Sequence, residues 1–175
     1  MKLSQKLNER SDSISVIGLG YVGLPLTCSL AKAGFKVFGL DIDENKINKL
    51  NKNESYISYI DNSIIENLNN SNFCASNDFS YISKSDVIVI CVPTPLSKNR
   101  EPDLSYIAKT IDTIAPYLKK NQLISLESTT YPGMTDELIS TRLKSEGFEV
   151  GNDFHLVYSP EREDPGNKDF STSNI

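Results

Sequence analysis

Short apolar runs alternate with amphipathic stretches along this chain. Strands buried on both faces are continuously apolar, whereas surface helices repeat apolar positions every three or four residues. On this basis strands are expected at 14–18, 36–40, 73–75, 87–92, 122–126 and 154–158, and helices at 24–33, 43–51, 64–68, 78–83, 104–119 and 134–145. Acidic residues at or near helix starts are typical N-caps (Asp43, Asp78 and Asp103), and Gly34 and Gly147 are typical helix stops.

This alternation of strands and helices predicts the α/β class. Successive strands joined by helical crossovers form a parallel sheet, and right-handed crossovers place helices on both of its faces. We expect a doubly wound parallel sheet of about six strands within a domain at 13–175, preceded by a polar N-terminal extension at 1–12. In such sheets ligands bind beyond the carboxyl ends of the strands, so the residues that follow each strand are the candidates for chemistry.

Composition narrows the function classes. The 175 residues carry 18 basic and 23 acidic side chains, a net charge of −5 with no basic block, so neither nucleic acid nor an anionic membrane is an expected partner. No apolar run reaches the roughly 20 residues of a membrane span, and the polar N-terminus does not resemble a secretory signal. Cys28, Cys74 and Cys91 are too widely spaced for a disulfide framework or a metal site. A cytoplasmic globular domain without a metal is the resulting expectation.

A glycine-rich turn follows the first expected strand. Gly18, Gly20 and Gly23 fit the pattern G-x-G-x-x-G, with Tyr21 and Val22 between the last two glycines. The first glycine permits a tight turn, the second lets a pyrophosphate approach the backbone, and the third lets the helix pack on the sheet. The alternative is a glycine-rich turn between two core elements. The preceding strand, the following helix and an acidic residue at the end of the next strand favour a Rossmann-type dinucleotide site.

That acidic residue is Asp41, which ends the second expected strand 18 residues after Gly23. A carboxylate at this position accepts hydrogen bonds from the adenosine ribose and repels a 2′-phosphate, so NAD is favoured over NADP. Asp43 is the local competitor, and its position suits a helix N-cap. Lys46 on the following helix could reach the ribose or the adenine edge, and a solvated surface charge is an equal alternative.

Polar loops follow three later strands at the expected ligand-binding edge. Two prolines, Pro93 among them, flank Thr94 and hold it in extended backbone facing the cofactor, although an ordinary proline loop explains these residues as well. Thr129 lies in the loop after the fifth strand. Glu161 and Arg162 follow the sixth strand, where a carboxylate could act as a base or orient water. A solvated loop charge is the alternative for that glutamate.

Together these segments resemble the UDP-glucose/GDP-mannose dehydrogenase family. The matching stretches, in the family's order and spacing, are 16–26, 41–43, 92–95, 127–133 and 158–162. The stretch at 160–167 is most similar to the branch that acts on UDP-N-acetylglucosamine. The resemblance implies that the C6 alcohol of a UDP-sugar is oxidised to a carboxylate with two NAD in succession. A cysteine thiolate traps the intermediate aldehyde, and water cleaves the thioester that follows.

The resemblance also implies roles for individual residues. The implied cofactor contacts are Gly18, Gly20, Tyr21, Val22, Gly23, Asp41, Lys46, Pro93, Thr94 and Thr129. Thr129 also matches a threonine that helps to hold the active-site water. Glu161 matches the carboxylate that activates or orients this water during thioester hydrolysis, and Arg162 lies in the substrate loop, where it could meet the phosphates or the carboxylate product.

In this family the nucleophilic cysteine lies in a later substrate-binding domain, and a long helix between the two halves builds the homodimer. None of the cysteines in this chain matches that nucleophile, so we expect the NAD-binding half of a UDP-sugar 6-dehydrogenase, inactive alone. His155, the only histidine, is expected to be structural. The alternatives are a standalone non-catalytic dinucleotide-binding module and a 6-phosphogluconate-type dehydrogenase, against which the Pro-Glu-Arg loop argues. The sequence leaves the identity of the sugar open.

Overall fold

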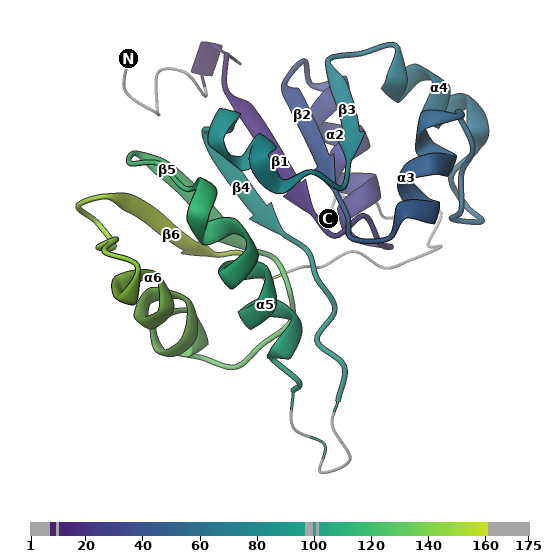
Figure 1. Ribbon diagram of the computed structural model, residues 1–175. Helices are drawn as coiled ribbons and strands as arrows, with labels where there is room; N and C mark the ends of the chain where they lie inside the picture. Colours follow the sequence, from purple (N-terminus) through teal and green to yellow (C-terminus); the bar gives the residue numbers. More distant parts are fainter. Residues whose placement is uncertain (1–7, 10, 97–99, 101, 161–175) are drawn as a thin grey trace.

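The computed structural model of the chain describes residues 8–9, 11–96, 100 and 102–160. Within these ranges six strands form one parallel sheet in the order β3-β2-β1-β4-β5-β6 (Figure 1). The strands are β1 (Ser13–Ile17), β2 (Lys36–Leu40), β3 (Phe73–Ser76), β4 (Val87–Ile90), β5 (Gln122–Leu126) and β6 (Phe154–Tyr158). The order reverses between β1 and β4, as in doubly wound sheets, so the predicted fold class is confirmed.

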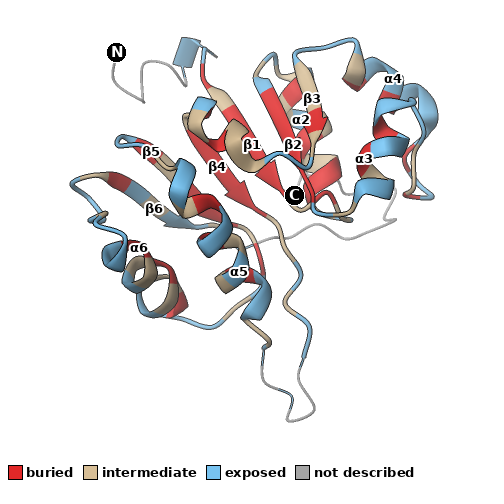
Figure 2. Ribbon diagram, in the orientation of Figure 1, coloured by how far each residue is buried: buried red, intermediate tan, exposed pale blue. Residues whose placement is uncertain are grey.

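Helices cover both faces of this sheet (Figure 1). On one face lie α2 (Gly23–Lys32), α3 (Glu44–Asn51) and α4 (Asn62–Asn69), and on the other lie η1 (Phe79–Lys84), α5 (Ser105–Ile114), η2 (Ala115–Tyr117), η3 (Thr135–Ser140) and α6 (Thr141–Ser145). Each face of the sheet has its own core layer: the first lies under α2, α3 and α4, and the second lies under the helices of the other face. Adjacent strand residues point to opposite faces, so Val16 joins the first core layer and Ile17 joins the second. Figure 2 shows the resulting band of buried residues along the central strands.

Two predicted elements end two or more residues earlier than expected, and proline is the reason in both. The fourth strand stops at Ile90 instead of residue 92, because the chain then enters the proline loop and proline cannot donate to a strand ladder. The helix expected at 104–119 ends as α5 at Ile114, and Pro116 lies in the 3₁₀ turn η2 that follows. Leu104, and not Asp103, is the N-cap of α5, although an Asp103 carboxylate oxygen accepts the Ser105 N–H at 2.9 Å.

Other elements differ in length or in type from the predictions. The helix expected at 64–68 is longer, since α4 spans Asn62–Asn69, and the one expected at 78–83 is the 3₁₀ helix η1, whose Asp78 accepts the Ser80 N–H as its N-cap. The first half of the helix at 134–145 is a π-helix, η3, before α6 continues it. Across the ranges that the structure describes, no helix combines the length and apolarity needed to cross a membrane.

Candidate functional site

The glycine-rich turn joins β1 to α2 at the carboxyl end of the sheet. Gly18 has a φ of 90°, and a Cβ on it would lie 2.7 Å from the backbone oxygen of Cys91. A Cβ on Gly23 would lie 1.9 Å from the oxygen of Gly18. Around Gly20, by contrast, no atom of the described residues lies within 4 Å of an added Cβ. Packing therefore requires two of the glycines, and the middle one leaves open surface where a ligand can approach the backbone.

The turn presents three consecutive backbone N–H groups at the start of α2. Those of Gly20, Tyr21 and Val22 have no hydrogen-bond partner within the described part of the chain. Val22 is the N-cap of α2 and makes no side-chain cap, and the first turn of α2 holds no acidic residue. A helix N-terminus carries partial positive charge, so these donors together form a receptor for an anion such as a pyrophosphate. The residues present therefore fit a dinucleotide.

Asp41, the predicted ribose acceptor, follows β2 and is only 5% exposed. Its Oδ2 accepts the Leu19 N–H at 2.8 Å and the Lys46 ammonium at 2.9 Å. Its Oδ1 accepts the Asp43 N–H at 2.9 Å. Each carboxylate oxygen carries two lone pairs, so Oδ1 keeps acceptor capacity for a ligand hydroxyl. The carboxylate thus ties the glycine turn to the start of α3 and still offers an oxygen at the strand end.

The two neighbours of Asp41 that the sequence left ambiguous take different positions. Asp43 is the N-cap of α3, because its backbone is extended and its side chain accepts the Asn45 N–H at 2.9 Å. Lys46 is half-buried, and its ion pair with Asp41 holds the ammonium beside the turn, 6.0 Å from the Tyr56 ring centroid. The geometry therefore favours a position in the site for Lys46 over the surface-charge alternative.

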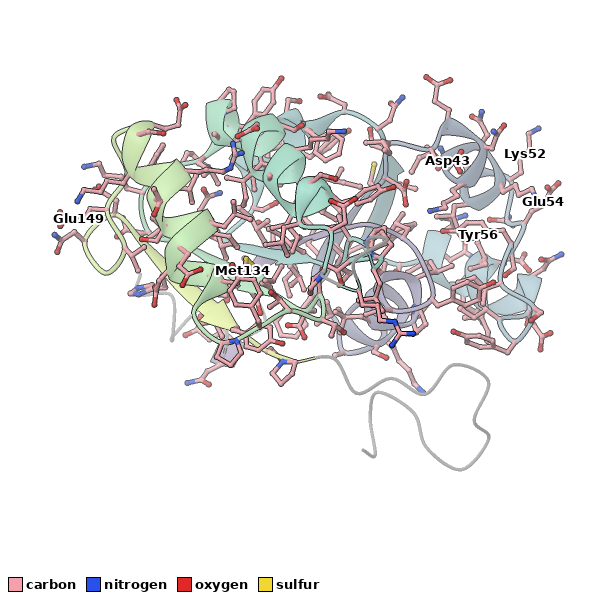
Figure 3. The ribbon with its side chains drawn as sticks, turned by 90° about the horizontal axis from the view of Figure 1, so that it is seen from below. Asp43, Lys52, Glu54, Tyr56, Met134 and Glu149 are labelled. Carbon is pink, nitrogen blue, oxygen red and sulfur yellow. The ribbon has the colours of Figure 1, made fainter. Side chains whose placement is uncertain are left out.

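Two tyrosines that sequence reasoning missed hold the outer side of the turn. The Tyr56 hydroxyl donates to the Leu19 carbonyl at 2.6 Å, and the Tyr59 hydroxyl donates to the Tyr21 carbonyl at 3.1 Å. Figure 3 shows Tyr56 on the side of the molecule that carries Asp43. Burial raises the pKa of the Tyr56 phenol, with the nearby Asp41 charge adding to the effect, so this hydroxyl remains a donor.

The tyrosine segment carried a signal that could have been found in the sequence. Residues 55–60 read Ser-Tyr-Ile-Ser-Tyr-Ile, an apolar repeat every three residues inside a polar stretch. Ile57 and Ile60 are buried in the first core layer and anchor the segment there. A third missed residue is Ile42, which is 79% exposed between Asp41 and Asp43. It presents apolar surface next to the candidate ribose acceptor, where a flat aromatic base could pack.

The loops after β4 and β5 meet at the same edge of the sheet. The Ser128 hydroxyl donates to the Val92 carbonyl at 2.6 Å and so fastens one loop to the other. Thr94 is half-buried, whereas Pro93 and Thr129 are exposed at this edge. Glu161 and Arg162 lie outside the described residues. The structure therefore brings the loops of two predicted cofactor-contacting threonines together with the turn on the carboxyl side of the strands.

The cysteines and the histidine do not form a nucleophilic site. Burial raises the pKa of the Cys28 thiol to about 11, which keeps it protonated, and the thiolate is the nucleophilic form. Cys74 lies in the edge strand β3, and Cys91 lies beneath the turn against Gly18 and Gly23. His155 is the second residue of β6, the other edge strand. It is exposed and lies away from the carboxyl end of the strand. These positions agree with the expectation that the chain's cysteines do not supply the nucleophile.

A doubly wound parallel sheet, a glycine turn at the point where its strand order reverses and an acidic residue at the end of β2 define a Rossmann-type dinucleotide-binding domain. Residues 12–174 match the model of the UDP-glucose/GDP-mannose dehydrogenase family, NAD binding domain, and the chain belongs to this family. The predicted family and the predicted NAD cofactor are therefore confirmed.

Individual relatives show the same relationship. Protein CapL of Staphylococcus aureus is 38% identical over 158 residues, which are 89% of this chain and 36% of that protein. The UDP-N-acetyl-D-glucosamine 6-dehydrogenase of Pseudomonas aeruginosa is 34% identical over 163 residues, 93% of this chain and 38% of that enzyme. The solved structure of the UDP-N-acetyl-mannosamine dehydrogenase Cap5O from S. aureus has a TM-score of 0.81 at 35% identity, covering 88% of this chain and 38% of its own. The chain thus spans a little over a third of the length of these relatives.

Proposed function

We propose that this chain is the NAD-binding part of an enzyme that oxidises the C6 alcohol of a UDP-N-acetylhexosamine to a carboxylate. The observation that carries the proposal is the row of three N–H groups at the start of α2, which have no acceptor among the described residues and lie beside the buried carboxylate of Asp41. Relatives named for N-acetylglucosamine and for N-acetylmannosamine are similarly close to this chain, at 34% and 36% identity. They support the class of sugar, with UDP-N-acetylglucosamine as the first substrate to test.

In this proposal each part of the cofactor is bound by different residues of the site. The N–H groups of Gly20, Tyr21 and Val22 bind the pyrophosphate, since they are aligned with the positive end of α2. Asp41 accepts from the adenosine ribose, and Ile42 supplies the apolar surface under the adenine. Lys46 is held beside the ribose position by its ion pair with Asp41. NAD, when bound, accepts the hydride from the substrate.

The remaining roles concern the edge of the sheet where the loops after β4 and β5 lie, and two residues that follow β6 in the sequence. Pro93 and Thr94 contact the cofactor on this side. Thr129, which is exposed after β5, holds a water. Glu161 activates or orients that water, and Arg162 meets the phosphates or the product carboxylate. These roles stay predictions, as do the bounds 1–12 and 13–175, a cytoplasmic location and a homodimer of the full-length enzyme.

Calorimetric titration of the purified chain tests the proposal. We expect one NAD site and at least about ten-fold weaker binding of NADP, because the Asp41 carboxylate repels a 2′-phosphate. Addition of UDP-N-acetylglucosamine to the NAD-loaded chain should give no NADH absorbance, since none of its cysteines matches the family's nucleophile. Absence of NAD binding would refute the cofactor assignment. Sustained NADH formation would show that these 175 residues hold a complete catalytic site.

A further inference from the structure

The carbonyls that the two tyrosines bind belong to particular peptide units. The Leu19 carbonyl shares its peptide with the Gly20 N–H, and the Tyr21 carbonyl shares its peptide with the Val22 N–H. No peptide bond in the described residues is cis. In a planar trans peptide the C=O and the N–H point in opposite directions. A hydrogen bond that fixes either carbonyl on the outer side of the turn therefore aims its paired N–H at the opposite, ligand-facing side.

A hydrogen bond to a carbonyl also changes the donor strength of the same peptide. Hydrogen bonds in a chain polarise one another, so an O–H donating to the oxygen makes the N–H of that peptide a better donor. Tyr56 is suited to this task, because its bond to the Leu19 oxygen is short, 2.6 Å, and its hydroxyl stays protonated. Tyr59 makes the equivalent bond at 3.1 Å, and its ring lies 6.3 Å from that of Tyr21.

We propose that Tyr56 and Tyr59 are positioning residues that aim and polarise the Gly20 and Val22 N–H groups toward the pyrophosphate of NAD. The inference rests on the proposed NAD site and adds two residues to it from a segment 37 and 38 positions away from their carbonyl partners in the sequence. Asp41 completes the arrangement from a third side, because it accepts the Leu19 N–H and leaves that amide unable to rotate toward the ligand.

The test compares Tyr56→Phe, Tyr59→Phe and the double variant with the wild type, and Tyr117→Phe on η2 is the matched control. Each variant keeps its aromatic ring and loses only the hydroxyl. The ligands are NAD and ADP, which carry a pyrophosphate, and adenosine, which lacks one. The weak binding of adenosine is followed by NMR titration. We expect each single site variant to bind NAD and ADP about two- to ten-fold more weakly, the double variant more weakly still, and adenosine unchanged. The control should match the wild type.

Each outcome distinguishes this inference from the proposed function. If the wild type does not bind NAD, the proposed function itself is wrong. If the wild type binds but the folded variants bind NAD equally well, the positioning role is refuted. An equal loss for adenosine would refute it too, since it would assign the tyrosines to the general shape of the adenosine side. Should Tyr56→Phe fail to fold, Tyr59→Phe, at a position exposed to solvent, carries the same comparison.

Discussion

Asp41 connects the local structure of the chain to its ligand. Its carboxylate accepts the turn amide of Leu19, the amide of the α3 N-cap Asp43 and the Lys46 ammonium, and it lies at the strand end where a ribose would approach. The motif spacing pointed to Asp41 as the first carboxylate after the second apolar run, with Asp43 as its competitor. The spacing could not indicate that three protein donors share the carboxylate, since that depends on how the turn and α3 come together.

Removal of this carboxylate should weaken cofactor binding and reduce its specificity for NAD over NADP. We expect Asp41→Ala to lose about ten- to a hundred-fold in NAD affinity, because hydrogen bonds to charged groups are the stronger ones, and to discriminate less against NADP. Calorimetric titration with both cofactors measures the change. Asp61→Ala, at an exposed position before α4 that makes no side-chain cap, is the control. Unchanged affinity for both cofactors would remove Asp41 from the site.

Tyr56 should give the fold a distinct dependence on alkaline pH. An unfolded tyrosine ionises near about pH 10, whereas burial raises the pKa of the folded Tyr56 above that value. Above about pH 10 the unfolded chain therefore binds fewer protons than the native chain, and stability must fall as pH rises. Below that pH the contribution of Tyr56 is fully present.

Urea unfolding between about pH 8 and about pH 11 checks this dependence on the wild type and on Tyr56→Phe. Other tyrosines and lysines titrate equally in both proteins, so the difference between the two curves isolates this residue. The wild type should lose stability more steeply than the variant above about pH 10. Parallel curves would mean that the Tyr56 phenol is not buried as described.

Among the secondary-structure elements, the strands were the most predictable from the sequence. Strands β2, β5 and β6 have the predicted bounds, because a continuous apolar run between polar or glycine residues specifies a buried strand locally. The helices were less predictable where a proline follows the last turn, as at Pro116, or where the hydrogen-bond pattern departs from the α form, as in the π-helix η3. The apolar repeat at 55–60 marks the tyrosine segment in the sequence, but no local pattern records its contacts, which join the β1–α2 turn to the α3–α4 connection.

Two alanine substitutions in the glycine turn should have different effects on folding and on NAD binding. Gly23→Ala places a Cβ at 1.9 Å from the Gly18 oxygen, so α2 must move away from β1 and the variant should be destabilised by several kcal/mol or fail to fold. Gly20→Ala meets no protein atom of the described part within 4 Å, so it should melt within a few degrees of the wild type and lose NAD binding. Thermal melts followed by titration measure both. A Gly20→Ala variant that binds NAD normally would contradict the pyrophosphate assignment.

The molecule as a whole is one parallel sheet with a layer of helices on each face, and several loops lie at its carboxyl edge. It belongs to the UDP-glucose/GDP-mannose dehydrogenase family and spans 36% and 38% of two relatives' lengths. The class of fold followed from the alternation of elements, and the family followed from five short segments in a fixed order. The sugar did not follow from either, because relatives named for two different N-acetylhexosamines match this chain similarly well.

An amide NMR titration of the labelled chain with NAD locates the cofactor on the fold. The largest shifts should fall on the Gly20, Tyr21 and Val22 amides, with a second group at Asp41 and Ile42, and all should saturate together with one affinity. Saturable shifts centred on another edge of the sheet, or no saturable shifts at all, would contradict the proposed site.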